Sequence, residues 1–204
     1  MKRILSHMLV ATAVLMVSAL PASAVTVYST FGPGDTYDST AGVVVSGDSN
    51  IAASFTVPSA NSYTLDSIRI GAGFYGTGGP SDDLIVRLTN NGGSTVYESL
   101  SVHVTNLNIY TVPSVSHPTL TAGATYWVVL SPENSSEMFS WMRNDQNIYE
   151  WYYKSSGAWI ASGGTTPAFE VNGSLAPVPI PSTLLLVGSG LAGLVGIGRR
   201  RFKK

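Results

Sequence analysis

The stretch Leu84–Val102, LIVRLTNNGGSTVYESLSV, determines the fold class that we expect for the whole chain. Apolar side chains alternate along its first part, as they do in a strand with one buried face. The second part continues this alternation, except that Glu98 falls on the apolar face. Asn90-Asn91-Gly92-Gly93 stands between the two parts and is typical of a tight hairpin turn. The stretch therefore predicts two antiparallel strands, Leu84–Thr89 and Val96–Val104. The apolar faces are made of Leu84, Val86 and Leu88 in the first strand, and Val96, Leu100, Val102 and Val104 in the second.

Short apolar segments of the same kind occur on both sides of this hairpin, and none of them has a helical period of 3.6 residues. Glycine-rich turns such as Gly32–Gly34 and Gly76–Pro80 separate them. Many short strands between such turns predict an all-β fold, an antiparallel, jelly-roll-like β-sandwich over residues 25–175. The further strands expected are Val25–Ser29, Ile51–Val57, Leu65–Ile70, Tyr126–Leu130, Met138–Met142, Ile148–Tyr153 and Ala168–Val171.

The first 24 residues have the three parts of a secretory signal peptide. Lys2 and Arg3 give a positive start, the apolar run 8–20 follows, and Ala22-Ser-Ala24 closes the segment. Small residues in this pattern are a cleavage site. We expect export through the inner membrane with cleavage after Ala24; an uncleaved anchor is the alternative.

Residues 176–204 form a proline-rich linker, an apolar run and a basic tail. Residues 180–198 carry no charge, and as a helix they would span about 28 Å, close to the thickness of a hydrocarbon core. The lysines and arginines of 199–204 would stay on the cytoplasmic side, which places the rest of the chain outside. The pattern predicts one membrane-spanning helix at about residues 182–198, with a buried core helix as the alternative.

This tail resembles the PEP-CTERM sorting signal of Gram-negative bacteria. The matching residues are Val178, Pro179, Ile180, Pro181 and Ser182 before the helix, and Arg199, Arg200 and Arg201 after it. The resemblance implies recognition by the membrane protease exosortase and delivery to the cell surface. In the family a glutamate stands between the two prolines, where this chain has Ile180. Two outcomes follow: a transient anchor that the protease removes, or a permanent one.

A second resemblance covers most of residues 25–175. The segments Phe31–Tyr37, Ile51–Phe55, Tyr63–Ile68, His117–Trp127 and Ala168–Gly173 are similar to the choice-of-anchor R domain. That family consists of exported bacterial β-rich domains with alternative C-terminal anchors, and it has no established catalytic residues. The resemblance implies a surface or extracellular protein associated with exopolysaccharide.

Charge and cysteine content exclude several classes of function. Between residues 25 and 176 there are four basic residues and twelve acidic ones, a formal net charge of -8. Such a domain repels phosphate backbones, so we expect no nucleic-acid partner. The chain has no cysteine, which excludes disulfides, thiolate catalysis and Cys-ligated zinc.

The residues that could carry catalysis are sparse, and we expect a protein that is not an enzyme. His103 and His117 are the histidines of the exported part, and neither lies in a Gly-x-Ser-x-Gly motif. Acid pairs for glycoside hydrolysis could come from Glu133, Glu137, Asp145 or Glu150. We interpret these acids as surface charge and keep a secreted hydrolase as a remote alternative.

No cofactor is expected, and calcium is the one metal that the sequence makes a candidate. Aspartates in glycine-rich loops supply the hard oxygen ligands that Ca²⁺ prefers. None of them forms the Asp-x-Asp-x-Asp-Gly loop, and ordinary Asx turns are the competing interpretation. These residues are Asp35, Asp38, Asp48, Asp82 and Asp83.

Aromatic residues gather between residues 139 and 159, beside amide and carboxylate side chains. Flat rings can stack on sugars, while large aromatic side chains also fill cores. The candidate glycan contacts are Trp141, Trp151 and Trp159. We expect an exported, non-enzymatic surface or matrix protein, and a carbohydrate-binding module is the alternative. The cluster consists of Phe139, Trp141, Tyr149, Trp151, Tyr152, Tyr153 and Trp159.

Overall fold

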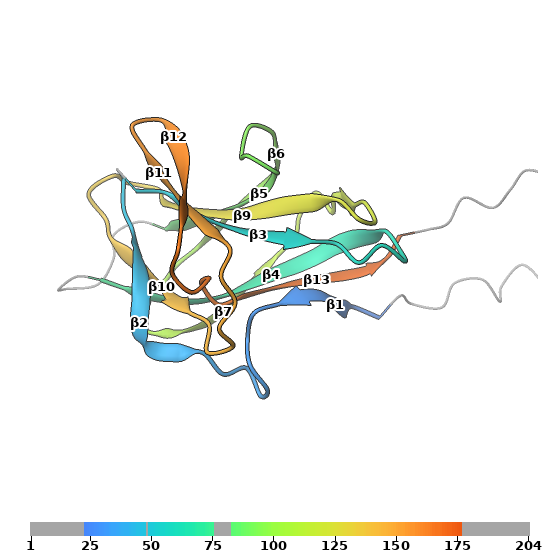
Figure 1. The fold of residues 1–204 in the computed structure, drawn as a ribbon, viewed down its shortest axis with the longest axis horizontal. Helices are drawn as coiled ribbons and strands as arrows, with labels where there is room; N and C mark the ends of the chain where they lie inside the picture. Colours follow the sequence, from blue (N-terminus) through green and yellow to red (C-terminus); the bar gives the residue numbers. More distant parts are fainter. Residues whose placement is uncertain (1–22, 48, 76–82, 177–204) are drawn as a thin grey trace, which may run out of the picture.

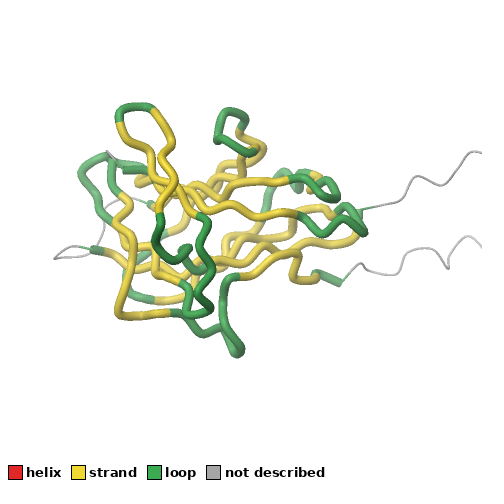
Figure 2. The backbone as a smooth tube through the Cα atoms, viewed as in Figure 1, coloured by secondary structure: helices red, strands yellow, loops and turns green. Residues whose placement is uncertain are grey.

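The computed structural model describes residues 23–47, 49–75 and 83–176. Within these ranges the protein is all-β with antiparallel pairing, as predicted. Strands and loops account for all of the described chain, which contains no helix that could cross a membrane (Figure 2). The predicted membrane helix and nearly all of the predicted signal peptide lie outside the described residues.

Two antiparallel sheets form two layers in a β-sandwich-like arrangement (Figure 1). The first sheet contains β1 (Val25–Ser29), β2 (Asp38–Val45), β4 (Tyr63–Phe74), β7 (Asn108–Pro113), β8 (Thr119–Leu120), β10 (Phe139–Arg143) and β13 (Phe169–Leu175). The second contains, in spatial order, β12 (Ala158–Ser162), β11 (Trp151–Ser155), β3 (Ile51–Thr56), β9 (Thr125–Pro132), β5 (Leu84–Asn90) and β6 (Val96–Val102). Long β4 is the centre of the first sheet, because it pairs with β13, β10, β7 and β8.

A strand is present at each of the nine predicted places, although several boundaries differ. The largest error is at Ile148–Tyr153, where β11 begins only at Trp151. Residues 144–150 form a loop instead, because the Asn144 side chain accepts hydrogen bonds from the amides of Gln146 and Ile148. Strands β2, β7, β8 and β12 were not predicted. They lie at sheet edges. An edge strand is held by hydrogen bonds to a neighbouring strand on one side, and its own sequence need not show a clear apolar pattern.

The predicted hairpin is confirmed, with one correction to its register. The Asn90 carbonyl accepts a hydrogen bond from Gly93, and its side chain accepts one from the amide of Thr95. An irregularity in the ladder then pairs Val96 with Thr89, whereas Glu98 pairs with Leu88. Because paired residues share a face, Val96 lies off the core face on which it was predicted, and about half of its surface is exposed.

The core lies between the two sheets and receives side chains from both. β4 contributes Leu65, Ile68 and Ile70, and β5 contributes Leu84, Val86 and Leu88 as predicted. The rings of Phe55 and Phe169 meet across the two layers at 6.2 Å between centroids. Burial of apolar surface at this interface, at roughly 25 cal/mol per Å², is the main force that holds the sheets together.

Glu98 is buried at the edge of this core, although the sequence presents it only as an exception to the apolar face. Its carboxylate accepts hydrogen bonds from the Ser114 hydroxyl at 2.6 Å and from the amides of Val115 and Ser116 at 2.6 and 2.7 Å. These donors belong to the loop that follows β7 of the first sheet, while Glu98 belongs to β6 of the second. The carboxylate therefore joins the two layers along one edge.

Both ends of the described chain lie at the same end of the molecule (Figure 1). Val25, the first residue of β1, pairs with Gly173 near the end of β13. The amide of Ala176 donates to the Ser62 carbonyl, which fixes the last described residue beside the start of β4. The predicted cleavage site after Ala24 thus lies directly at the first strand.

Candidate functional site

Trp141, a predicted glycan contact, is a core residue in the structure. Its side chain has no exposed surface and forms an edge-to-face pair with Phe169. The indole Nε1 donates a hydrogen bond of 3.0 Å to the Ala168 carbonyl. Trp141 is therefore not part of any surface that a ligand could reach in this structure.

Trp151 also packs into the core, where 7% of its surface is exposed. The guanidinium of Arg143 lies over its ring, 5.6 Å from the centroid, and donates a hydrogen bond to the Thr165 carbonyl. The Trp151 Nε1 has no hydrogen-bond partner among the described residues. Its ring faces are occupied by protein, so it does not offer a stacking surface.

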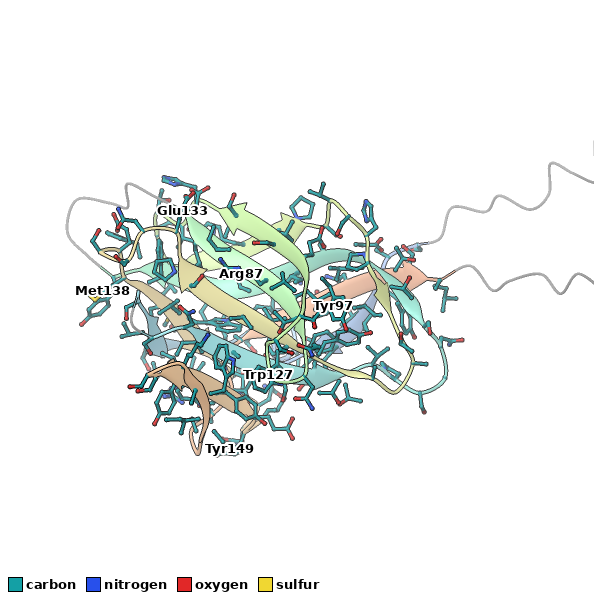
Figure 3. All side chains as sticks on the ribbon, turned by 90° about the horizontal axis from the view of Figure 1, so that it is seen from above. Arg87, Tyr97, Trp127, Glu133, Met138 and Tyr149 are labelled. Atoms are coloured by element: carbon teal, nitrogen blue, oxygen red, sulfur yellow. The ribbon has the colours of Figure 1, made fainter. Side chains whose placement is uncertain are left out.

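Trp159 is the one predicted contact that lies on the outside of the second sheet. Its ring meets Trp127 edge to face at 5.3 Å, and the Tyr152 ring stacks on Trp127 at 4.4 Å. Trp127 is almost fully buried, whereas Tyr152 and Trp159 are partly exposed. We call Trp127, Tyr152 and Trp159, with Ala52 and Val129 beneath them, the aromatic face. Figure 3 looks onto this side of the molecule, with Trp127 and Arg87 near its centre.

Strand register explains why these residues meet. Across the second sheet Arg87 is opposite Val129, Val129 opposite Ala52, and Ala52 opposite Tyr152. The four residues therefore form one row on the outer face, over β5, β9, β3 and β11. Trp159 reaches this face from β12, the edge strand that pairs with β11.

The β5–β6 turn closes against the aromatic face at Gly93. A Cβ atom on Gly93 would lie 2.8 Å from the Trp159 Nε1, closer than atoms can pack. The residue also has a φ of 70°, which glycine adopts without strain. Only glycine fits here without displacing the Trp159 ring, so the predicted hairpin turn also helps to position the aromatic face.

The two histidines are held in separate contacts. His103 lies 3.0 Å from the carboxylate of Asp83, and the His117 Nδ1 donates to the Leu65 carbonyl. Within the described residues, neither imidazole ring is hydrogen-bonded to a serine hydroxyl. In the part of the chain that the structure describes, these contacts do not place a serine hydroxyl beside either imidazole.

The described acidic residues that were candidate calcium ligands or catalytic acids have protein partners. Asp35 forms two hydrogen bonds to Arg69, and these hold the pKa of its carboxyl below the ordinary value. Asp38 accepts hydrogen bonds from Thr40, as expected of an Asx turn. Among the described residues no three acidic or histidine side chains are grouped to hold a metal. Asp48 and Asp82 lie outside the described residues.

Each of the four candidate catalytic acids has an interaction within the protein. Glu133 accepts a hydrogen bond from the amide of Asp83, and Glu150 accepts one from Ser54 on the outer face. Asp145 accepts one from its neighbour Gln146, and Glu137 also has an interaction within the protein. These contacts fit the interpretation of surface charge and turn formation.

Sequence reasoning missed Trp127, although a signal was present, and it named Tyr152 only as a member of the aromatic cluster. In β9, Tyr126, Val128 and Leu130 point into the core, so the alternation assigns Trp127 to the outside. A tryptophan on the solvent side of a strand is an unusual use of that residue.

No protein-family model matches this chain, and no curated protein matches its sequence.

Proposed function

We propose that this protein is an exported, non-enzymatic surface or matrix protein, delivered by a PEP-CTERM type of sorting and associated with exopolysaccharide. Its described part would be a jelly-roll-like β-sandwich, since strands β3, β4 and β5 alternate between the two sheets. The order of the motifs in the tail, from Val178 to Arg201, supports exosortase as the partner. The observation that carries the proposal is that the two ends of the described chain lie at the same end of the molecule (Figure 1).

Before cleavage, a domain with a signal peptide at one end and an anchor at the other is joined to the membrane at both ends, which is easiest when the two ends lie on the same side. Val25 begins β1 directly after the predicted cleavage site, and Ala176 leaves beside it towards the predicted helix. The signal peptide and the anchor can therefore lie in the same membrane without crossing the domain. The loops at the other end would face outward.

The first prediction concerns the mature mass. We expect the protein isolated from the surface fraction to lack residues 1–24 and to end near Pro181, because signal peptidase and exosortase each remove one segment. Intact-mass spectrometry of that fraction measures both ends. Replacing Ile180→Glu restores the family pattern and provides the matched control, which should give the same processed product.

A different result would separate the two outcomes for the tail. If the natural chain keeps a tail that ends in Lys204 while the Ile180→Glu variant is processed, the helix is a permanent anchor. If both chains retain residues 1–24 in the inner membrane, this segment is an uncleaved anchor and the predicted cleavage after Ala24 is wrong. Processing can be followed in the same preparations by the loss of the basic tail.

Carbohydrate binding is the second candidate function, and the aromatic face is the observation that favours it. Partly exposed rings of Tyr152 and Trp159 are held by a buried ring, Trp127, which gives a rigid surface on which sugars can stack. Trp141 and Trp151 are core residues and do not contribute to this surface.

The second prediction therefore concerns Trp159. Trp159→Ala should weaken binding to the matrix polysaccharide of the producing cell by about tenfold, equivalent to about 1.4 kcal/mol of lost stacking. Affinity electrophoresis or a pull-down with that polysaccharide measures the change. Tyr75→Ala is the matched control, because Tyr75 is exposed but follows β4 in the first sheet. Equal losses in both variants would mean that the aromatic face is not the binding site.

A further inference from the structure

The distribution of basic residues suggests which kind of glycan the aromatic face accepts. Only four basic side chains lie in residues 25–176, among twelve acidic ones. Arg69 forms ion pairs with Asp35 and Glu170 at 2.6 and 2.9 Å. Arg143 lies over Trp151 in the core and across the ladder from Asp38. Both have structural partners within the protein.

The other two, Arg87 and Lys154, belong to the aromatic face. Arg87 lies in the row that continues through Val129 and Ala52 to Tyr152. The Lys154 Nζ lies over the Trp159 ring, 5.7 Å from its centroid. Among the residues that the structure describes, no ion pair joins either cation to a carboxylate. Three of the four basic side chains, Arg87, Arg143 and Lys154, form no ion pair among the described residues, and two of these three lie together on the outer face of the second sheet.

Polar groups accompany these charges. The Arg87 Nη1 donates to the Ser131 hydroxyl at 2.6 Å, and Ser99 is opposite Arg87 in the ladder. The Trp127 Nε1 is buried and has no hydrogen-bond partner among the described residues. Because this N–H has almost no exposed surface, contacts with a ligand would come from the charged groups and the partly exposed rings.

We propose that the aromatic face binds an acidic polysaccharide whose carboxylate groups are neutralised by Arg87 and Lys154, a proposal that rests on the carbohydrate-binding function above. Tyr152 and Trp159 supply the stacking surface, and a guanidinium is well suited to a planar carboxylate. Arg87 on β5 and Tyr152 on β11 are three strand spacings apart, about 14 Å. The ligand is therefore a segment of a polymer, rather than a single sugar.

Four purified polymers provide the test, two of them acidic (sodium alginate and polygalacturonate) and two neutral (laminarin and dextran). The full-length chain in mild detergent should bind the acidic polymers at least tenfold more tightly than the neutral ones. Raising the salt concentration should weaken acidic binding, because exposed charges are screened over about 10 Å at 0.1 M ionic strength. Arg87→Gln and Lys154→Gln should each reduce the preference for the acidic polymers by about threefold or more.

Two controls keep the result interpretable. Tyr75→Ala should leave all affinities unchanged, and thermal unfolding of each variant shows whether it has kept its fold. If one of the two charge variants fails to fold, the other still tests the proposal. Equal affinity for laminarin and alginate, or insensitivity to both charge substitutions, would overturn the acidic preference and leave glycan binding standing. Absence of binding to every polymer would overturn both.

Discussion

Replacing Trp141 by alanine is expected to lower the free energy of unfolding by about 3–5 kcal/mol, the usual cost of removing a large buried aromatic side chain. Trp141 has no exposed surface, packs edge to face on Phe169, and donates to the Ala168 carbonyl. The substitution leaves a cavity between the layers and a carbonyl without its donor. Urea denaturation of the purified protein, followed by far-UV circular dichroism, measures the change.

Two variants show whether this loss comes from the core position of Trp141. Trp159→Ala removes the same side chain from the outer face and should cost less than half as much, since the Trp159 ring is partly exposed. Trp141→Phe keeps most of the buried ring and should lose about 1–2 kcal/mol, from the hydrogen bond and a smaller cavity. A Trp141→Ala protein as stable as the natural one would contradict the buried position. Trp141→Phe should also bind polysaccharide normally, unlike Trp159→Ala.

The fold class could be predicted because it depends on local alternation. In β5, Leu84, Val86 and Leu88 point to one side, and the Asn-Gly turn after them specifies an antiparallel partner. Some edge strands, such as β1 and β6, carry this signal, but β2, β7, β8 and β12 do not. The sequence of β12, from Ala158 to Ser162, is too short and too mixed to be recognised, and only pairing with β11 makes it a strand.

The sequence located the aromatic cluster, but local alternation could not show which of its members lie in the core and which lie on the surface. Aromatic residues are dense in this part of the sequence, which is why Trp141, Trp151 and Trp159 became candidates. In the structure the three lie on different strands and different faces. Their exposure depends on sheet order, which places β10 in one layer and β11 and β12 in the other. Trp127 comes to Trp159 from a strand more than 20 residues earlier, a contact that no local pattern contains.

Glu98 illustrates the same limit at the level of a single residue. Alternation places it correctly on the inner face, where an isolated carboxylate would be costly. Its partners Ser114, Val115 and Ser116 are far enough along the chain that nothing in the sequence connects them to it. The edge between β6 and the loop after β7 brings donor and acceptor together.

Removing this carboxylate should be among the most harmful single changes outside the apolar core. Glu98→Ala is expected to cost about 3 kcal/mol of unfolding free energy, because one buried hydroxyl and two backbone amides lose a charged acceptor. Glu98→Gln keeps the shape and one acceptor oxygen, and should cost about 2 kcal/mol. Asp38→Asn is the matched control for loss of an acidic group, since Asp38 is partly exposed on an edge strand and an asparagine can still accept the hydrogen bonds from Thr40. Urea denaturation at pH 7 compares the four proteins.

The pH dependence gives an independent test of Glu98. Burial raises the pKa of its carboxyl, but the hydrogen bonds from Ser114 and from the amides of Ser116 and Val115 lower it by more, so the pKa lies below the ordinary value of 4.5. A carboxyl with a lowered pKa in the folded state stabilises the protein above its unfolded pKa. That stability is lost as the pH falls from about 4.5 through the folded pKa.

The difference in stability between the natural chain and Glu98→Gln should therefore be constant from pH 7 to pH 5 and shrink as the pH falls towards 3. Asp35 and Asp145, whose pKa values are also lowered, remain in both proteins and cancel in this comparison. Urea denaturation at pH 7, 5, 4 and 3 measures the difference. A gap that stays the same at every pH would mean that Glu98 contributes through its shape, and that its charge does not hold the two sheets together.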